Sequence, residues 1–167
     1  MRISTALKKI RTLKNELSRL IAIRKKNFYV IIPKNVSIED ADIEIRFNEI
    51  TDRIDKTLNE IAILRERLLR TNINTYVEID GEKVSLSLLK LLVDNVRSEL
   101  AQIQSIKNSG YSFTSRQRRI STTDDEEKEV AQLNDLELEN KVKELEKQKL
   151  ALEKKLEYKN ATTKLVS

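Results

Sequence analysis

The chain has 167 residues, a length that corresponds to one domain, and charged residues make up 35% of it against 4% for aromatic residues. With only two glycines and one proline, almost nothing interrupts helices, so the composition favours long, surface-rich helices over a compact aromatic core. The absence of cysteine and histidine excludes disulfides, thiolate sites, a histidine general base and the commonest metal ligand.

A first helix is predicted from about Ser4 to Lys26. Its apolar residues recur every three or four positions, the pattern of a helix that packs one face on a partner. These residues are Ile3, Ala6, Ile10, Leu13, Leu17, Leu20 and Ile23. In the linker that follows, over residues 27–36, Pro33 stops the helix from continuing. The apolar segment Phe28–Ile32 is expected to cover the open end of a helical bundle, and docking on a partner or a membrane interface is the alternative.

A second, longer helix is predicted from Ser37, whose side chain can cap it, to about Asn72. It carries the most regular apolar stripe of the chain, in which only Thr57 is polar. The stripe consists of Ile43, Phe47, Ile50, Ile54, Thr57, Ile61, Leu64 and Leu68. Thr57 either fixes the register of packing or lies at a frayed edge.

A second stripe, formed by Leu58, Ala62 and Leu69, lies beside the first on the same helix. One antiparallel partner cannot cover both stripes, and a shorter first helix leaves part of the longer one uncovered. We therefore predict that the chain assembles into a homo-oligomer, with Leu58, Ala62 and Leu69 among the contact residues.

The pair Asp80 and Gly81, flanked by alternating side chains over residues 76–84, predicts a β-hairpin. A third helix is predicted from about Ser85 to Asn108, with Gly110 as its C-terminal stop. Its stripe contains Leu86, Leu89, Val93, Val96, Leu100, Ile103 and Ile106.

A polar linker leads to a fourth helix, which Thr123 and Glu126 are expected to begin as a capping box and which ends near Asn160. Its seam contains Leu138, Val142, Leu145, Lys149, Leu152 and Leu156. The tail, residues 162–166, favours a strand that could extend the β-hairpin of the same chain or of a neighbouring one. Thr163 and Leu165 are therefore further candidates for self-association.

The two halves of the chain, residues 1–77 and 84–166, follow one plan of shorter helix, linker, longer helix and strand-forming end. This favours an internal duplication within one elongated domain, residues 1–167; the alternative is that any two helices with this repeat align in some register. The predicted fold class is mainly α: two antiparallel hairpins of long helices in a coiled-coil-like bundle, with a small β-hairpin between them that a C-terminal strand could join.

A set of short motifs extends over most of the chain. The residues concerned are Leu68, Leu69, Arg70, Thr71, Asn72, Thr75, Gly81, Leu86, Leu89, the cluster from Arg116 to Arg119, and Asn160, Ala161, Thr162 and Thr163. In these motifs the chain resembles a family of small bacterial coiled-coil proteins that carry the label septicolysin-like and are otherwise uncharacterised. The resemblance implies an oligomeric helical protein with a small β element, and the label implies a cytolysin. The lysine-rich fourth helix and the segment Phe28–Ile32 depart from the family pattern.

Two basic clusters border the linkers. Arg116, Arg118 and Arg119 lie in the second linker, and Arg24, Lys25 and Lys26 precede the first. One hypothesis is that they bind phosphates of nucleic acid or of lipid headgroups. The alternative is that they are solvated cations placed near a helix C-terminus.

No catalytic, cofactor-binding or metal-binding residues are predicted, because the sequence contains no glycine-rich phosphate loop, no metal-ligand spacing and no nucleophile motif. No apolar run approaches the about 20 residues that cross a bilayer, so we expect no transmembrane segment and a cytoplasmic protein. The leading hypothesis is a non-catalytic, self-assembling coiled-coil scaffold or interaction protein without a small-molecule substrate. A binder of nucleic acid or of anionic membrane surfaces is the second hypothesis, and the cytolysin implied by the resemblance is the third.

Overall fold

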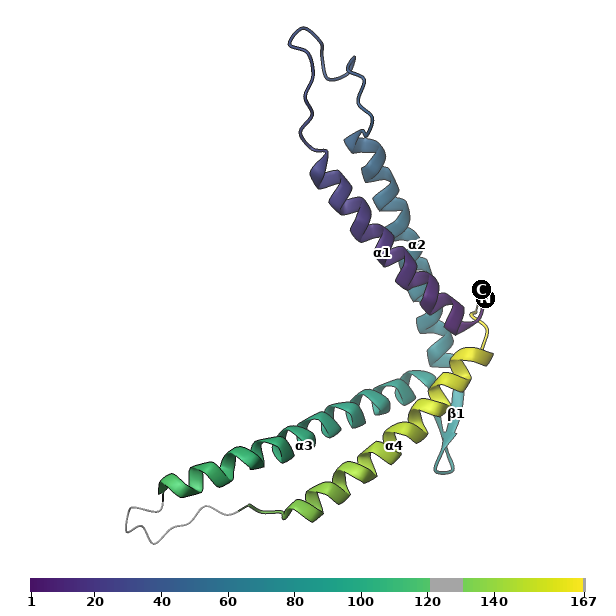
Figure 1. Cartoon of the computed structure of the whole chain (residues 1–167). Coiled ribbons are helices and arrows are strands. Elements are labelled where there is room, and N and C mark those ends of the chain that lie inside the picture. The colour runs from purple at the N-terminus through teal and green to yellow at the C-terminus, as the bar shows by residue number, and fades with distance from the viewer. Residues whose placement is uncertain (121–130, 167) are drawn as a thin grey trace. The chain divides into compact units, whose positions relative to one another are not determined.

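A computed structural model describes the backbone of residues 1–120 and 131–166 and the side chains of residues 1–108 and 131–166. The described elements, in chain order, are α1 (Ile3–Lys26), α2 (Phe47–Asn74), β1 (Tyr76–Ile79), β2 (Glu82–Ser85), α3 (Leu86–Ile120) and α4 (Asp135–Thr162). The predicted fold class, helical hairpins with a small β-hairpin between them, is confirmed (Figure 1). Contacts divide the chain into two compact units, Met1–Thr75 with Asn160–Ser167, and Tyr76–Lys159.

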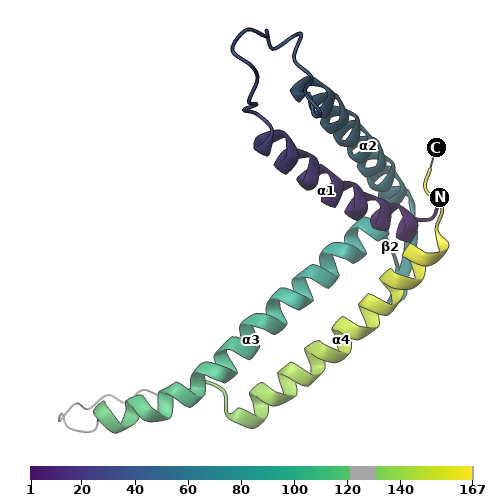
Figure 2. The same cartoon turned by 45° about the horizontal axis from the view of Figure 1, so that its top comes forward.

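In the first unit, α1 and α2 run side by side as an antiparallel hairpin (Figures 1 and 2). The stripe predicted on α1 is buried at Ile3, Ala6, Ile10, Leu13 and Leu20, and that on α2 is buried at Ile50, Ile54, Thr57, Ile61, Leu64 and Leu68. An ion pair between Lys9 and Glu60 joins the outer surfaces of the two helices. Thr57 lies within the buried seam, where its Oγ1 donates to the carbonyl of Arg53 at 2.8 Å, so it is not at a frayed edge.

The predicted start of the second helix is wrong. The backbone at Ser37 does form a turn, in which the hydroxyl of Ser37 donates to the carboxylate of Asp40 at 2.8 Å, but the helix begins only at Phe47. Ile43 therefore lies outside the helix, and Phe47 is exposed. Since α1 ends at Lys26, a helix continued before Phe47 would run past the end of its partner, and most helical stability comes from packing on a partner. Ile45 still packs against Leu20, Ile50 and Ile54, but from the loop.

The C-terminal tail pairs with the N-terminus of its own chain. The amide of Ile3 donates to the carbonyl of Thr163 at 3.0 Å, and the amide of Leu165 donates to the carbonyl of Met1 at 2.8 Å. Arg2 and Lys164 form an isolated antiparallel bridge, while the sheet of the β-hairpin contains β1 and β2 only. The expected strand therefore does not extend the hairpin; it closes the first unit instead.

The second unit begins with the predicted β-hairpin. Its two-residue turn places Asp80 and Gly81 at φ angles of 51° and 86°, the left-handed conformations that a type I′ turn requires. The β-hairpin leads directly into α3, which Ser85 caps by accepting the amide of Leu88 at 3.1 Å.

Two predicted helix ends in this unit are wrong. The backbone of α3 passes through Gly110 and ends at Ile120. A glycine inside a helix costs only about 1 kcal/mol, so it stops a helix only where the flanking residues favour an end. The fourth helix begins at Asp135, where Asn134 and Glu137 form a reciprocal capping box with bonds of 2.8 and 2.9 Å. The box expected at Thr123 and Glu126 lies outside the described residues.

Both helices of the second unit bury part of the apolar stripes predicted for them, although their backbones lie farther apart than those of α1 and α2 (Figure 2). Ile106, predicted for the α3 stripe, is exposed instead, and Ile103, Leu138 and Leu156 are half-buried. The buried residues are Leu86, Leu89, Val93, Val96 and Leu100 on α3, and Val142, Leu145 and Leu152 on α4. A charged link joins the helices, because Arg97 Nε donates to Glu153 Oε1 at 2.8 Å.

Candidate functional site

The outer face of α2 keeps an apolar stripe exposed. Leu58, Leu69 and Ile73 are 46%, 56% and 49% exposed, and Ala62 between them is exposed as well. Their spacing of four, seven and four residues places them along one line of the helix, beside the seam that α1 covers. The sequence analysis identified Leu58, Ala62 and Leu69 but missed Ile73. Ile73 lies four residues after Leu69, and this helical spacing could have revealed it as a member of the stripe. We name these four residues the α2 stripe.

Charge changes sign along α2. Residues 47–60 contain four carboxylates and two cations, whereas residues 61–74 contain three arginines and one carboxylate. Arg70 and Glu66 pair within the helix at 2.6 Å, and Arg67 Nε donates to the carbonyl of Val166 at 2.8 Å. The α2 stripe therefore runs from an acidic half of the helix into a basic half.

The predicted self-association residues of the tail are used within the chain. Leu165 is buried, and the carbonyl of Thr163 accepts the amide of Ile3. The amide of Val166 donates to Thr71 Oγ1 at 3.0 Å, which fixes the tail to α2. These contacts make the tail part of the first unit, so among the predicted self-association residues Leu58, Ala62 and Leu69 are the ones that form an exposed apolar surface.

The loop between α1 and α2, residues 27–46, exposes an apolar segment that we name the apolar tip, Phe28–Ile32. Ile31 is fully exposed, Tyr29 nearly so and Phe28 more than half. The expectation that this segment covers the end of a helical bundle is therefore wrong. No helix extends beyond Lys26 on α1 or before Phe47 on α2 to receive it.

The base of this loop is ordered by aromatic contacts. The Phe28 ring meets the rings of Tyr29 and Phe47 edge-on, with centroids 5.0 and 5.7 Å apart. The Arg24 guanidinium lies 5.5 Å from the centroid of Phe47, and Arg24 Nη1 donates to Thr51 Oγ1 at 3.3 Å. Above this base, the two arms of the loop border a hollow of about 220 Å³.

The predicted basic clusters have different surroundings. Arg24 is engaged at the loop base, whereas Lys25 and Lys26, next to the apolar tip, are exposed. Arg116, Arg118 and Arg119 lie on the backbone of α3 rather than in a linker, and their side chains are outside the described ones. Of the two predicted clusters, the described side chains thus include two exposed cations beside the apolar tip, Lys25 and Lys26.

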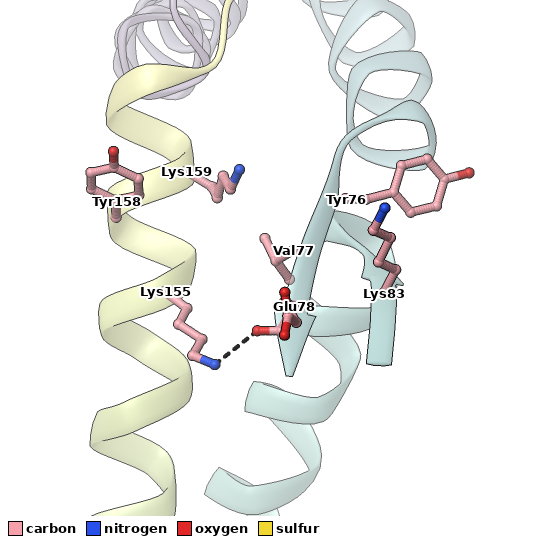
Figure 3. A pocket seen from close by; sticks show the side chains of 7 residues that line it. All are labelled: Tyr76, Val77, Glu78, Lys83, Lys155, Tyr158 and Lys159. Atoms are coloured by element: carbon pink, nitrogen blue, oxygen red, sulfur yellow. Dashed lines mark hydrogen bonds between the residues drawn. The ribbon is translucent and has the colours of Figure 1, made fainter. Parts of the chain in front are cut away.

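A second hollow, of about 320 Å³, lies between β1 and the last turns of α4 (Figure 3). Lys83, Lys155 and Lys159 line it, and none of them forms an ion pair with a carboxylate among the described side chains. Lys155 Nζ donates to the backbone carbonyl of Glu78 at 2.8 Å. Lys155 of α4 thereby occupies a carbonyl of β1 that β2 does not use, which helps to keep that strand edge from pairing with another strand.

Within the described side chains, no group of three or more acidic residues is arranged to hold a metal ion. None of the described helices is long and apolar enough to cross a membrane. Comparisons with protein-family models, with characterised proteins and with solved structures find no match for this chain. The resemblance to the septicolysin-labelled family therefore stays a prediction.

Proposed function

We propose that this protein is a non-catalytic, self-assembling helical scaffold, in which the α2 stripe binds the α2 stripe of a second copy. The observation that carries the proposal is the exposure of Leu58, Ala62, Leu69 and Ile73 along one line of a helix whose neighbouring face is already covered by α1. Two apolar lines side by side on one helix are typical of helices that pack between two neighbours.

The charge pattern of α2 supports an antiparallel arrangement. When two α2 stripes pair in opposite directions, Leu58 lies opposite Ile73 and Ala62 lies opposite Leu69. In this register Glu60 of one copy is level with the turn that holds Arg70 of the other, and Arg65 is level with Glu66. A parallel arrangement in register sets each arginine against its own copy, which is unfavourable. The small side chain of Ala62, near the middle of the stripe, lets the two helices approach closely.

The apolar area supports a reversible association. Burying a whole Leu or Ile side chain stabilises by about 1.5–3 kcal/mol, so each half-exposed residue of the stripe contributes about 1 kcal/mol. Three such residues on each of two copies give about 6 kcal/mol, and the cost of association, itself several kcal/mol, offsets most of this. The association should therefore be weak and reversible, with a mass that rises towards the highest accessible concentrations.

A matched pair of variants tests this surface. Leu69→Glu should abolish the rise of mass with concentration in sedimentation equilibrium, because it places a carboxylate in the middle of the apolar contact. Ile63→Glu should leave the rise unchanged, since Ile63 is 57% exposed, close to the 56% of Leu69, but lies on a different face of α2. A protein that stays monomeric over the accessible concentration range refutes the proposal.

The direction of pairing is tested separately, and the absence of cysteine in the chain gives a clean background. A Leu58→Cys chain is mixed with a differently tagged Ile73→Cys chain and oxidised mildly, because these two residues lie opposite each other when two α2 stripes pair in opposite directions. Residues 58 and 73 are about 22 Å apart along the helix, so each variant alone is too far from its own copy in an antiparallel pair for a disulfide. We expect disulfides between the two different chains. Disulfides between identical chains would show parallel pairing.

A further inference from the structure

The apolar tip has features that the proposed self-assembly does not use. It contains five consecutive apolar residues at the end of a helical hairpin, and Tyr29 and Ile31 extend away from the protein. Exposed apolar segments of this kind mark interaction sites, because burying them in a partner is favourable. Pro33 directly follows the segment and restricts its backbone.

Charge distinguishes the two arms of the loop. From Arg24 to Val36 the outgoing arm contains four cations and no carboxylate. The return arm, residues 37–46, contains four carboxylates and one arginine, Arg46. The Nη2 of Arg46 donates to the carbonyl of Ala41 at 3.0 Å. A partner that meets the outgoing arm therefore meets apolar side chains and free ammonium groups together.

We propose that the apolar tip docks on the surface of an anionic lipid bilayer. Tyr29 and Ile31 enter the boundary between headgroups and acyl chains, while Lys25 and Lys26 lie against acidic headgroups. Aromatic and aliphatic side chains beside cations are the combination that this boundary accommodates. The inference is independent of self-assembly through α2.

The chemistry of the tip favours a bilayer over nucleic acid. Binding of single strands uses several aromatic platforms on which successive bases stack. In the apolar tip the ring of Phe28 contacts Tyr29 and Phe47, and the other three residues, Val30, Ile31 and Ile32, are aliphatic, so Tyr29 is the one extended ring. A bilayer also needs no groove of matching shape, so a single protruding loop is sufficient. The carboxylates of the return arm, among them Asp42 and Glu44 at the loop hollow, restrict insertion to the outgoing arm.

Tryptophan fluorescence gives a direct test, because the chain contains no native tryptophan. In Ile31→Trp, vesicles of phosphatidylcholine mixed with phosphatidylserine should shift the emission to shorter wavelength, and brominated lipid should quench it. Ile63→Trp places the single tryptophan on α2, away from the apolar tip, and should show neither the shift nor the quenching. Equal shifts in both variants, or none in either, refute docking through the tip.

Co-sedimentation of the full chain with vesicles measures the two contributions separately. Replacing Tyr29 and Ile31 together by serine should lower partitioning by about tenfold or more, because two apolar side chains lose their burial. Lys25→Glu with Lys26→Glu should lower binding to phosphatidylserine vesicles by about tenfold or more. Leu91→Ser, at an exposed residue of α3, is the matched control and should not change binding. A native chain that binds duplex DNA but no vesicles at low salt overturns the inference.

Discussion

Thr71 provides a sharp test of how the C-terminal tail is held. Its side chain is 1% exposed, and its hydroxyl donates to the carbonyl of Arg67 at 2.7 Å while accepting the amide of Val166 at 3.0 Å. Thr71→Val keeps the shape of the side chain and removes both hydrogen bonds. The Val166 amide then loses its acceptor.

The expected cost follows from the surroundings of that amide. A buried donor left without a partner costs about 1–3 kcal/mol. Since Val166 is partly exposed, water can replace some of the lost bond, and we expect about 1–2 kcal/mol. This corresponds to a rise of about 5- to 30-fold in the population in which the tail is detached.

Native-state hydrogen exchange measures this population at the amides of Val166 and Leu165. We expect both to exchange faster in Thr71→Val, whereas amides in the middle of α1 keep their rates. Thr71→Ser retains the hydroxyl and should keep most of the protection. If Val166 exchanges no faster in Thr71→Val than in the native chain, the hydroxyl does not hold the tail and the reasoning is wrong.

Three further changes concern the second unit, and urea denaturation checks each. Leu89→Ala should lower the free energy of unfolding by about 2–5 kcal/mol because Leu89 is fully buried, while Leu91→Ala at an exposed position should lower it far less. Asn134→Ala should cost about 1 kcal/mol by removing the cap of α4, and Asn134→Ser should restore most of it. Gly81→Ala should cost about 1–2 kcal/mol from its φ of 86° alone, since a Cβ there meets no atom within 4 Å. An unchanged midpoint in any of the three disproves that argument.

The helix interiors were predictable because apolar residues at a spacing of three or four positions have few alternatives to a packed helix. The stripe from Ile50 to Leu68 is buried as expected, and Asp80 with Gly81 forms the turn that its residue types demand. Helix ends were less predictable. Ser37 makes a local capping contact yet begins no long helix, and Gly110 ends none.

The candidate surfaces were predictable only in part. The sequence identified Leu58, Ala62 and Leu69 as a second stripe, and it noted the apolar run at Phe28. It could not show that Leu165 is buried within its own chain, because the pairing partner of a short strand is not encoded in the strand itself.

The sequence by itself determined the periodicity of the helices, the β-hairpin turn and the absence of cysteine and histidine chemistry, since these depend on residue type and local spacing. The tertiary structure decided which apolar residues are covered. Because α1 ends at Lys26 and covers one face of α2 only, the α2 stripe and the apolar tip remain exposed. Coverage depends on where a partner helix ends, and that is a property of packing rather than of any single segment.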